Sequence, residues 1–227
     1  MRLSRDAEDV AKALALRERC FGTNDADSFD TTCDHVLIES RAGLVVACFR
    51  LLWLDGARIG TGYAARSYDL SALSGLPGPI LEIGRFCVDP ACRDADVLRL
   101  AWAAITTLVD REHVRLLIGC TSFSGIDPKP YRDCFALLHA RHLGPHDRRP
   151  AAVAAEVVSF GTLAHAPFDA QRATRMMPPL LRSYLAMGGW VGDHAVVDRQ
   201  MNTLHVFTAV EVAAIPEARK RLLRALV

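Results

Sequence analysis

The segment Leu81–Pro90, LEIGRFCVDP, has the composition of a strand whose hydrophobic alternation is interrupted once. Apolar residues occupy odd positions before Gly84 and even positions after it. Because successive side chains of a strand point to opposite faces, this shift requires one extra residue within the strand. The sequence therefore predicts a β-bulge at Gly84, which brings Glu82 and Arg85 onto the same face.

Opposite charges on one face of an apolar strand, directly before a helix, favour a functional site. The alternative is an ion pair between Glu82 and Arg85 that only organises the edge of a sheet. The strand pattern by itself does not decide between these two interpretations.

The hydrophobic periodicity predicts an α/β fold around a mixed central sheet. At 227 residues the chain suits one domain, 1–227, with a C-terminal elaboration over about 165–227. We expect helices over 6–20, 97–112, a segment ending near 142, 169–177, a segment beginning at 178–179, and the basic C-terminus. Strands are expected over 35–40, 44–53, 81–90, 114–120, 154–160 and 204–210, and mostly loops over 55–79, 121–130 and 188–203.

Composition argues against several classes of function. A balance of 27 basic and 26 acidic residues gives a formal net charge of +1, and no nucleic-acid-binding motif is present, so we expect no nucleic-acid partner. The seven cysteines form no CxxC pair, which argues against a metal centre. No apolar run approaches the roughly 20 residues that span a bilayer, and no apolar signal segment begins the chain. We expect a cytoplasmic protein, at most attached peripherally to the inner face of the membrane.

Charged and aromatic residues accompany the bulged strand at fixed spacings. They are Arg17 and Phe21, Asp27 and Asp30, Arg50, and Glu82 with Arg85 and Phe86. This order resembles the acyl-homoserine-lactone (autoinducer) synthase branch of the GNAT-like acyl-CoA N-acyltransferase fold. In that fold a bulged fourth strand leads to a helix whose N-terminus receives the thioester donor. The tryptophan that autoinducer synthases have between the Phe and the first Asp is missing here.

Five segments resemble the L-ornithine N(alpha)-acyltransferase family, the ornithine-acyl-[acyl carrier protein] N-acyltransferases of ornithine-lipid synthesis. They are RSYDLS (66–71), EIGRFCVDP (82–90), GCTSFSGIDP (119–128), PPLLRSYLAMGGWVGDHAVVD (178–198) and NTLHVF (202–207). The family usually has Asp-Val-Phe where this chain has His205-Val206-Phe207. This difference leaves open whether ornithine or another amino acid is the acceptor.

The resemblance implies transfer of a 3-hydroxyacyl chain from acyl carrier protein to the α-amine of L-ornithine, the first step of ornithine-lipid synthesis. A thioester is already activated, so the enzyme has to position its substrates, deprotonate the amine and stabilise an oxyanion. Glu82 is the candidate base, oriented by Arg85. In the alternative these two residues only pair, and a water chain carries the proton. Asp30 completes the catalytic set, because Asp27 and Asp30 either assemble the base or hold the δ-ammonium.

The acceptor carboxylate requires a cationic partner, for which Arg50 and Arg85 are the candidates. His205 is interpreted as a hydrogen-bonded structural histidine. The remaining substrate-binding candidates come from the resemblance and are Arg17, Phe21, Asp193, Asp198 and Asn202.

The donor is expected to lie along Phe86, Cys87 and Val88, whose backbone N–H groups can face the thioester. The loop that follows, VDPACRDADV, has no glycine and one arginine, Arg93. Coenzyme A presents a pyrophosphate, which such enzymes usually bind on a glycine-rich loop at a helix N-terminus. Carrier-bound pantetheine has only one phosphodiester. The loop therefore favours acyl carrier protein as the donor substrate, and we expect no bound cofactor and no metal.

Other activities remain open at this point. They are N-acylation of another amino acid, an autoinducer-type synthase, a small-acyl acetyltransferase, and a catalytically silent protein that binds acyl carrier protein or lipid. The joint presence of the five charged candidates around the bulged strand opposes the silent binder. The C-terminal segment EARKRLLRAL predicts a basic helix that either contacts anionic lipid or acidic carrier protein, or has an ordinary charged outer face.

Overall fold

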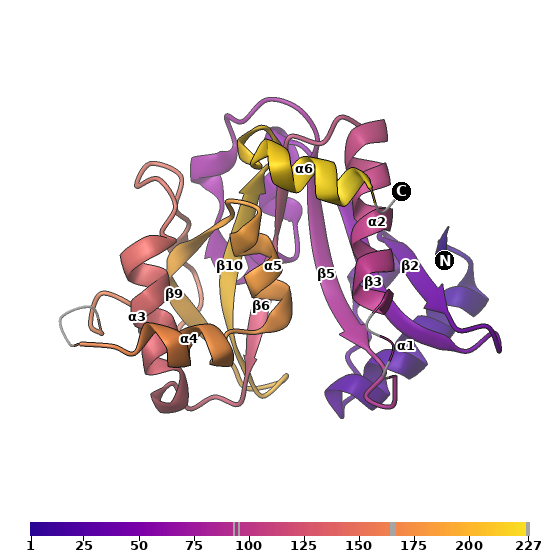
Figure 1. The fold of residues 1–227 in the computed structure, drawn as a ribbon, viewed down its shortest axis with the longest axis horizontal. Helices are drawn as coiled ribbons and strands as arrows, with labels where there is room; N and C mark the ends of the chain where they lie inside the picture. Colours follow the sequence, from indigo (N-terminus) through magenta and orange to yellow (C-terminus); the bar gives the residue numbers. More distant parts are fainter. Residues whose placement is uncertain (93, 95, 164–166, 226–227) are drawn as a thin grey trace.

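The computed structural model describes residues 1–92, 94, 96–163 and 167–225, and a mixed sheet of eight strands forms its centre (Figure 1). The strands follow the order β1-β2-β3-β5-β6-β10-β9-β8. Neighbouring strands are antiparallel except β5 and β6, which are parallel. A second sheet pairs β4 with β7. The α/β class predicted from the sequence is confirmed.

The helices and the predicted strands lie close to their expected ranges, whereas β1, β4, β7 and β9 were not predicted. The helices are α1 (Ala7–Phe21), α2 (Asp96–Arg111), α3 (Arg132–Arg141), α4 (Ala170–Met176), α5 (Pro179–Ala186) and α6 (Glu217–Arg224). The strands are β1 (Arg2–Ser4), β2 (Asp34–Glu39), β3 (Val45–Leu54), β4 (Tyr68–Asp69), β5 (Ile80–Val88), β6 (Leu116–Ser124), β7 (Ala151–Ala152), β8 (Val157–Ser159), β9 (Trp190–Asp198) and β10 (Thr203–Glu211). No helix in the described part of the chain is both long and apolar enough to cross a bilayer.

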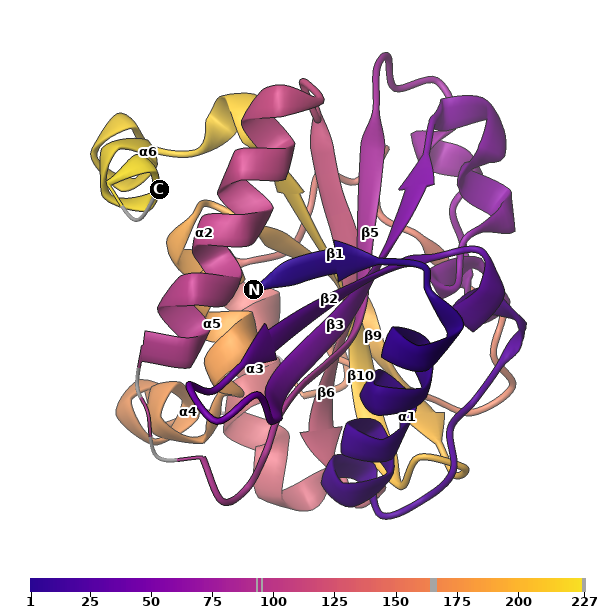
Figure 2. The same ribbon diagram turned by 90° about the vertical axis from the view of Figure 1, so that its right-hand side faces the viewer.

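Helices cover both faces of the sheet. Figure 2 shows β2 and β3 between α1 on one side and α2 on the other. The 55–79 segment, which contains three short 3-10 helices, extends the layer on the α1 side. α5 lies on the α2 side, with α3 and α4 further along that face. The sheet is therefore buried on both faces.

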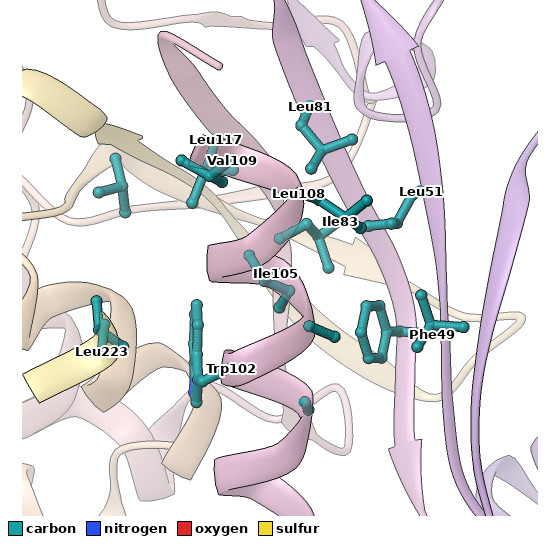
Figure 3. Packing of buried hydrophobic residues seen from close by; sticks show 14 of the residues in the cluster. Phe49, Leu51, Leu81, Ile83, Trp102, Ile105, Leu108, Val109, Leu117 and Leu223 are labelled. Carbon is teal, nitrogen blue, oxygen red and sulfur yellow. The ribbon is translucent and has the colours of Figure 1, made fainter. Parts of the chain in front are cut away.

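The core on the α2 side explains why α2 forms. Ala101, Ile105 and Leu108 recur at helical spacing and are buried. They pack against β3 and β5 side chains such as Phe49 and Ile83 (Figure 3). This contact fixes β5 relative to its helix and so positions the bulged end of the strand.

The bulge occurs, but one residue later than predicted. Gly84 pairs with Arg50 and Cys87 with Cys48, so Arg85 and Phe86 together oppose the single residue Phe49. Arg85 has a φ of 53°, a left-handed conformation that is uncommon outside glycine. Because the extra residue follows Gly84, Glu82 and Arg85 still share a face, as predicted. That face is the one covered by α1.

The prediction of a loop over 188–203 was wrong, because Trp190–Asp198 forms β9 between β10 and β8. Val206 pairs with Ala195 and Thr208 with Val191, so three residues of β9 oppose Phe207. This irregularity removes the period-2 pattern by which strands are recognised in a sequence. Strand β6 also extends through Ser124, into a segment predicted to be a loop.

Candidate functional site

The two parallel strands β5 and β6 separate, and a cavity of about 490 Å³ lies where they diverge. Their pairing covers only Ile80–Glu82 against Leu116–Ile118 (Figure 1). The next residue of β6 is Gly119, at which a Cβ atom would lie 2.4 Å from the carbonyl oxygen of Ile83. Glycine thus permits the close approach of the strands immediately before they separate.

Substitution of Gly119 is expected to damage both the fold and the cavity. In Gly119→Ala the methyl group meets rigid backbone, so we expect a loss of about 1–3 kcal/mol of unfolding free energy and lower activity. Urea denaturation monitored by circular dichroism measures the first effect. Gly60→Ala is the matched control, because a Cβ atom there meets nothing within 4 Å. Equal stability of the two variants would contradict this interpretation of Gly119.

The cavity has a polar side and an apolar side. Side chains on the α1 face of the sheet supply the polar groups Glu82, Arg85, Ser122, Asp198 and His205. Side chains on the opposite face, together with α5, supply an apolar lining of Ile83, Phe86, Phe123, Leu180 and Tyr184. One cavity can therefore hold a polar group next to a long apolar chain.

Glu82 lies at the point of divergence and is buried. Its carboxylate accepts hydrogen bonds from the backbone N–H groups of Tyr63, at 2.8 Å, and Ala64, at 2.7 Å. Burial raises the pKa of Glu82, although these bonds and the charge of Arg50 act to lower it. A fixed carboxylate of raised pKa that lines a cavity has the properties of a general base.

Arg85 faces the cavity but does not form an ion pair with Glu82. Its Nε atom lies 2.6 Å from a carboxylate oxygen of Asp25, and its NH2 group lies 3.4 Å from Asp27. The guanidinium also lies 4.7 Å from the centre of the Tyr63 ring. The predicted Glu82–Arg85 pair, whether to orient the base or to organise the pocket, is therefore not formed. Backbone N–H groups orient Glu82 instead.

A buried cluster of three arginines and three aspartates lies behind the cavity wall. Arg17 contacts Asp25 and Asp30, and Arg50 donates to Asp27 at 2.7 Å and to Asp30 at 2.8 Å. Side chains of Arg17 and Arg50 are only 1% and 3% exposed. Neither arginine lines the cavity, and nor do the aspartates. Their contacts hold Arg85 and the wall in place.

Acid is expected to destabilise this cluster. Burial acts to raise the pKa of Asp30, but hydrogen bonds from Arg17 and the backbone of Asp27 outweigh it and lower the pKa to about 2. A carboxylate whose pKa is lower in the folded state stabilises the fold above its unfolded pKa of about 3.9, and this contribution is lost as the pH falls through the folded value. We therefore expect the free energy of unfolding to decrease between about pH 4 and 2.

Urea titrations at several pH values measure this effect. Asp30→Asn is expected to show a smaller decrease over the same range, because it lacks the titrating group. A wild-type stability that stays constant over this range would contradict the assignment.

The other sequence candidates divide between the cavity and its surroundings. Phe21, Phe86, Asp198 and Asn202 line the cavity. Asp193 does not; it contacts His194 Nδ1 at 2.8 Å and has a half-exposed side chain. The predicted donor contacts Cys87 and Val88 lie outside the lining, and Arg93 lies outside the described residues.

Cys87 packs under α1, with its sulfur 3.6 Å from that of Cys48. The Cys48 contact, together with burial, raises the pKa of Cys87, so a reactive thiolate is disfavoured. Val88 uses its carbonyl oxygen to accept a hydrogen bond from Cys20. Among the described residues, no group of three or more His, Cys, Asp or Glu side chains is arranged to hold a metal ion.

Two residues of the site were not among the sequence candidates. Asp25 is the closest anionic partner of Arg85, and Tyr63 supplies both a ring beneath Arg85 and an N–H group to Glu82. Asp25 lies in the acidic run that contains Asp27 and Asp30, so its charge could have identified it as a candidate from the sequence. Tyr63 lies in a segment without periodicity, and only the folded chain brings it to the site.

Comparisons with known proteins agree with this fold. Residues 13–103 match the model of an acetyltransferase (GNAT) domain. FeeM, an N-acyl amino acid synthase from uncultured soil microbes, has a TM-score of 0.54 at 13% identity, over 93% of this chain and 90% of its own. BjaI, a CoA-dependent acyl-homoserine lactone synthase, has a TM-score of 0.50 at 15% identity, over 96% and 82%. The predicted GNAT-like fold is confirmed.

Sequence similarity is more specific than the fold. The L-ornithine N(alpha)-acyltransferase of Rhodobacter capsulatus is 32% identical over 97% of this chain and 92% of its own length. With this identity and coverage, the chain belongs to the L-ornithine N(alpha)-acyltransferase family.

Proposed function

We propose that this acyltransferase moves a 3-hydroxyacyl group from the thioester of acyl carrier protein to the α-amine of L-ornithine. The observation that carries the proposal is the cavity between β5 and β6, with the buried carboxylate of Glu82 on its polar side and an apolar lining opposite. The apolar side suits the acyl chain and the polar side suits the amino acid. The names of the relatives supply ornithine as the acceptor.

In the proposed reaction, Glu82 removes a proton from the α-ammonium, directly or through water. The neutral nitrogen attacks the thioester carbonyl and forms a tetrahedral oxyanion. The carbon–sulfur bond then breaks and releases the carrier thiolate, the nitrogen loses its second proton, and the thiolate takes up a proton to become the thiol. An α-amine titrates near 8 and a side-chain amine near 10.4, so the α-nitrogen is more often available as the neutral nucleophile.

The backbone of β5 supports the oxyanion step. Gly84, Arg85 and Phe86 line the cavity beyond the last residue of β5 that pairs with β6. Backbone groups on this side of β5 are therefore available to the substrate rather than to a neighbouring strand. An N–H group that points at the carbonyl oxygen would stabilise the negative charge as it develops.

The charges of the lining support a cationic acceptor. Glu82 and Asp198 are acidic, whereas the guanidinium of Arg85 is already balanced by Asp25 and Asp27. Free ornithine carries one carboxylate and two ammonium groups, so its net positive charge complements this lining. Arg85 is the one arginine among the described residues that line the cavity, and we assign it to the acceptor carboxylate.

The donor assignment is also part of the proposal. Absence of glycine from the loop after β5 favours the single phosphodiester of carrier-bound pantetheine over the pyrophosphate of coenzyme A. The product would be an amphiphile that enters lipid synthesis, and transient contact with the membrane surface follows from its chemistry. Leu222 of α6, with 62% of its surface exposed among basic residues, is the group we assign to such contact.

Mass spectrometry of products from a panel of acceptors and donors tests the proposal. The purified protein is incubated with a 3-hydroxyacyl carrier protein or the matching coenzyme A thioester, and with each of several free amino acids. We expect N-acyl-ornithine as the main product, formed faster from the carrier. Preference for another amino acid would overturn the acceptor assignment, and preference for coenzyme A would overturn the donor assignment.

A further inference from the structure

His205 is a buried residue of β10 that lines the polar side of the cavity. Its surroundings fix the position of its ring proton. Tyr68 is completely buried beside it, with its hydroxyl oxygen 2.8 Å from the His205 carbonyl oxygen and 3.2 Å from Nδ1. A tyrosine hydroxyl has one proton, and a carbonyl oxygen can only accept a hydrogen bond.

The proton of Tyr68 is therefore donated to the His205 carbonyl, and the hydroxyl oxygen must accept from Nδ1. This arrangement places the imidazole proton on Nδ1 and leaves Nε2 with a free lone pair. Burial lowers the pKa of His205 to about 4, against the opposing charge of Asp198, so the ring is neutral at physiological pH. None of the hydrogen bonds among the described residues uses Nε2 of His205.

Asp198 lies on the same face of the sheet and also lines the cavity. In the register of β9 and β10, Val196 pairs with His205 and Asp198 with Thr203, so the Asp198 and His205 side chains point the same way. One carboxylate oxygen of Asp198 accepts from the backbone N–H of Met201. A carboxylate and an unprotonated imidazole nitrogen together offer only hydrogen-bond acceptors. An ammonium group, with three donors and no acceptor, is the complementary partner.

The position of this pair relative to Glu82 indicates which kind of ligand is suitable. Glu82 pairs with Ile118 of β6, and His205 pairs with Ser122 of the same strand. The two positions are thus separated by about 13 Å along β6. The side chains of Glu82 and His205 extend into the cavity from the two ends of this interval. Acceptor groups at two separate places in the cavity suit a ligand with two separated ammonium groups.

We propose that Asp198 and His205 form a subsite for the side-chain ammonium of the acceptor, and that this subsite makes the enzyme select diamino acids. The inference rests on the proposed function, since it places the α-amine at Glu82. Tyr68 is a positioning residue in this subsite, because it holds the proton on Nδ1 and so leaves Nε2 free to accept.

Comparison of L-ornithine with L-norvaline, which lacks only the side-chain amine, tests the subsite. The readout is the ratio of kcat/KM for the two acceptors at a saturating donor concentration. A hydrogen bond to a charged group contributes enough that His205→Leu should lower this ratio about tenfold or more. Gln can place an oxygen near the position of Nε2, so His205→Gln should keep much of the wild-type ratio. Tyr68→Phe should give an intermediate decrease.

Two further variants complete the design. Asp198→Asn removes the negative charge while it keeps an oxygen for Met201, and it should lower the ratio at least as much as His205→Leu. His146→Leu, at an exposed histidine outside the cavity, is the matched control and should leave the ratio unchanged. An unchanged ratio in both Asp198→Asn and His205→Leu would overturn the proposal. Equal losses of kcat/KM for ornithine and norvaline would also overturn it, because they would indicate that the two residues have only a structural role.

Failure of the proposed function gives a different result. If the wild-type protein acylates neither amino acid, calorimetric binding of ornithine and norvaline to the same variants replaces turnover. Tighter binding of ornithine than of norvaline, lost in Asp198→Asn and His205→Leu, would still support the subsite. Absence of any preference for ornithine would overturn it.

Discussion

Glu82→Gln is expected to reduce kcat for acyl transfer about 10²- to 10⁴-fold, the range associated with a general base. Gln keeps the shape of the side chain and can still accept one of the two backbone hydrogen bonds from Tyr63 and Ala64. It cannot take a proton from the amine. Single-turnover kinetics with a saturating acyl-carrier donor measure the effect on the chemical step.

The pH dependence provides a second signature of the base. Because burial raises the pKa of Glu82, activity should increase with pH through an apparent pKa above the ordinary glutamate value of about 4.3. Glu112→Gln, a change at the exposed residue after α2, is the matched control and should retain wild-type kinetics. Full activity of Glu82→Gln would show that another group or a water chain removes the proton.

Arg50→Met is expected to destabilise the protein by about 3–5 kcal/mol, the cost of removing one partner from a buried ion pair. Met keeps an unbranched apolar side chain, but it removes three charged hydrogen bonds, two to Asp27 and one to Asp30. The buried carboxylate of Asp30 and the partly buried carboxylate of Asp27 then have fewer positive partners. Chemical denaturation, monitored by fluorescence and circular dichroism, gives the difference in unfolding free energy.

A surface arginine shows what burial contributes to this effect. Arg58 pairs with Asp55 at 3.0 Å, but its side chain is 61% exposed. Exposed pairs contribute at most about 1 kcal/mol, so Arg58→Met should be close to wild type. If Arg50→Met lowered the free energy of unfolding as little as Arg58→Met, the ion pairs of Arg50 would not stabilise the cavity wall.

Local sequence pattern predicted the bulged strand better than it predicted the rest of the sheet. The bulge near Gly84 could be predicted because the shift in apolar alternation is visible within the sequence of one strand. Its displacement to Arg85 and Phe86 could not, because the register also depends on which β3 residues lie opposite. The strand β9 was missed for a similar reason, since its irregular pairing with β10 breaks the alternation.

Partners in the charged cluster also required the folded chain. Spacing brought Asp27, Asp30 and Arg50 together as candidates, and the structure does place them in contact. The sequence analysis assigned Arg50 to the substrate, and the two aspartates either to the substrate or to assembly of the base, whereas in the structure these side chains pair mostly with one another and with Arg17. Burial decides this point, and the depth of a charged side chain cannot be read from a single sequence. Only Arg85 of the three arginines reaches the cavity.

The position of the new amide bond tests the central claim most directly. The wild-type protein is incubated with 3-hydroxyacyl carrier protein and ornithine labelled with ¹⁵N at the α-nitrogen, and the product is fragmented by tandem mass spectrometry. We expect the acyl chain on the labelled α-nitrogen, with the side-chain amine free. Acylation of the side-chain nitrogen would contradict the placement of the α-amine at Glu82, and absence of any acylated ornithine would contradict the proposed function itself.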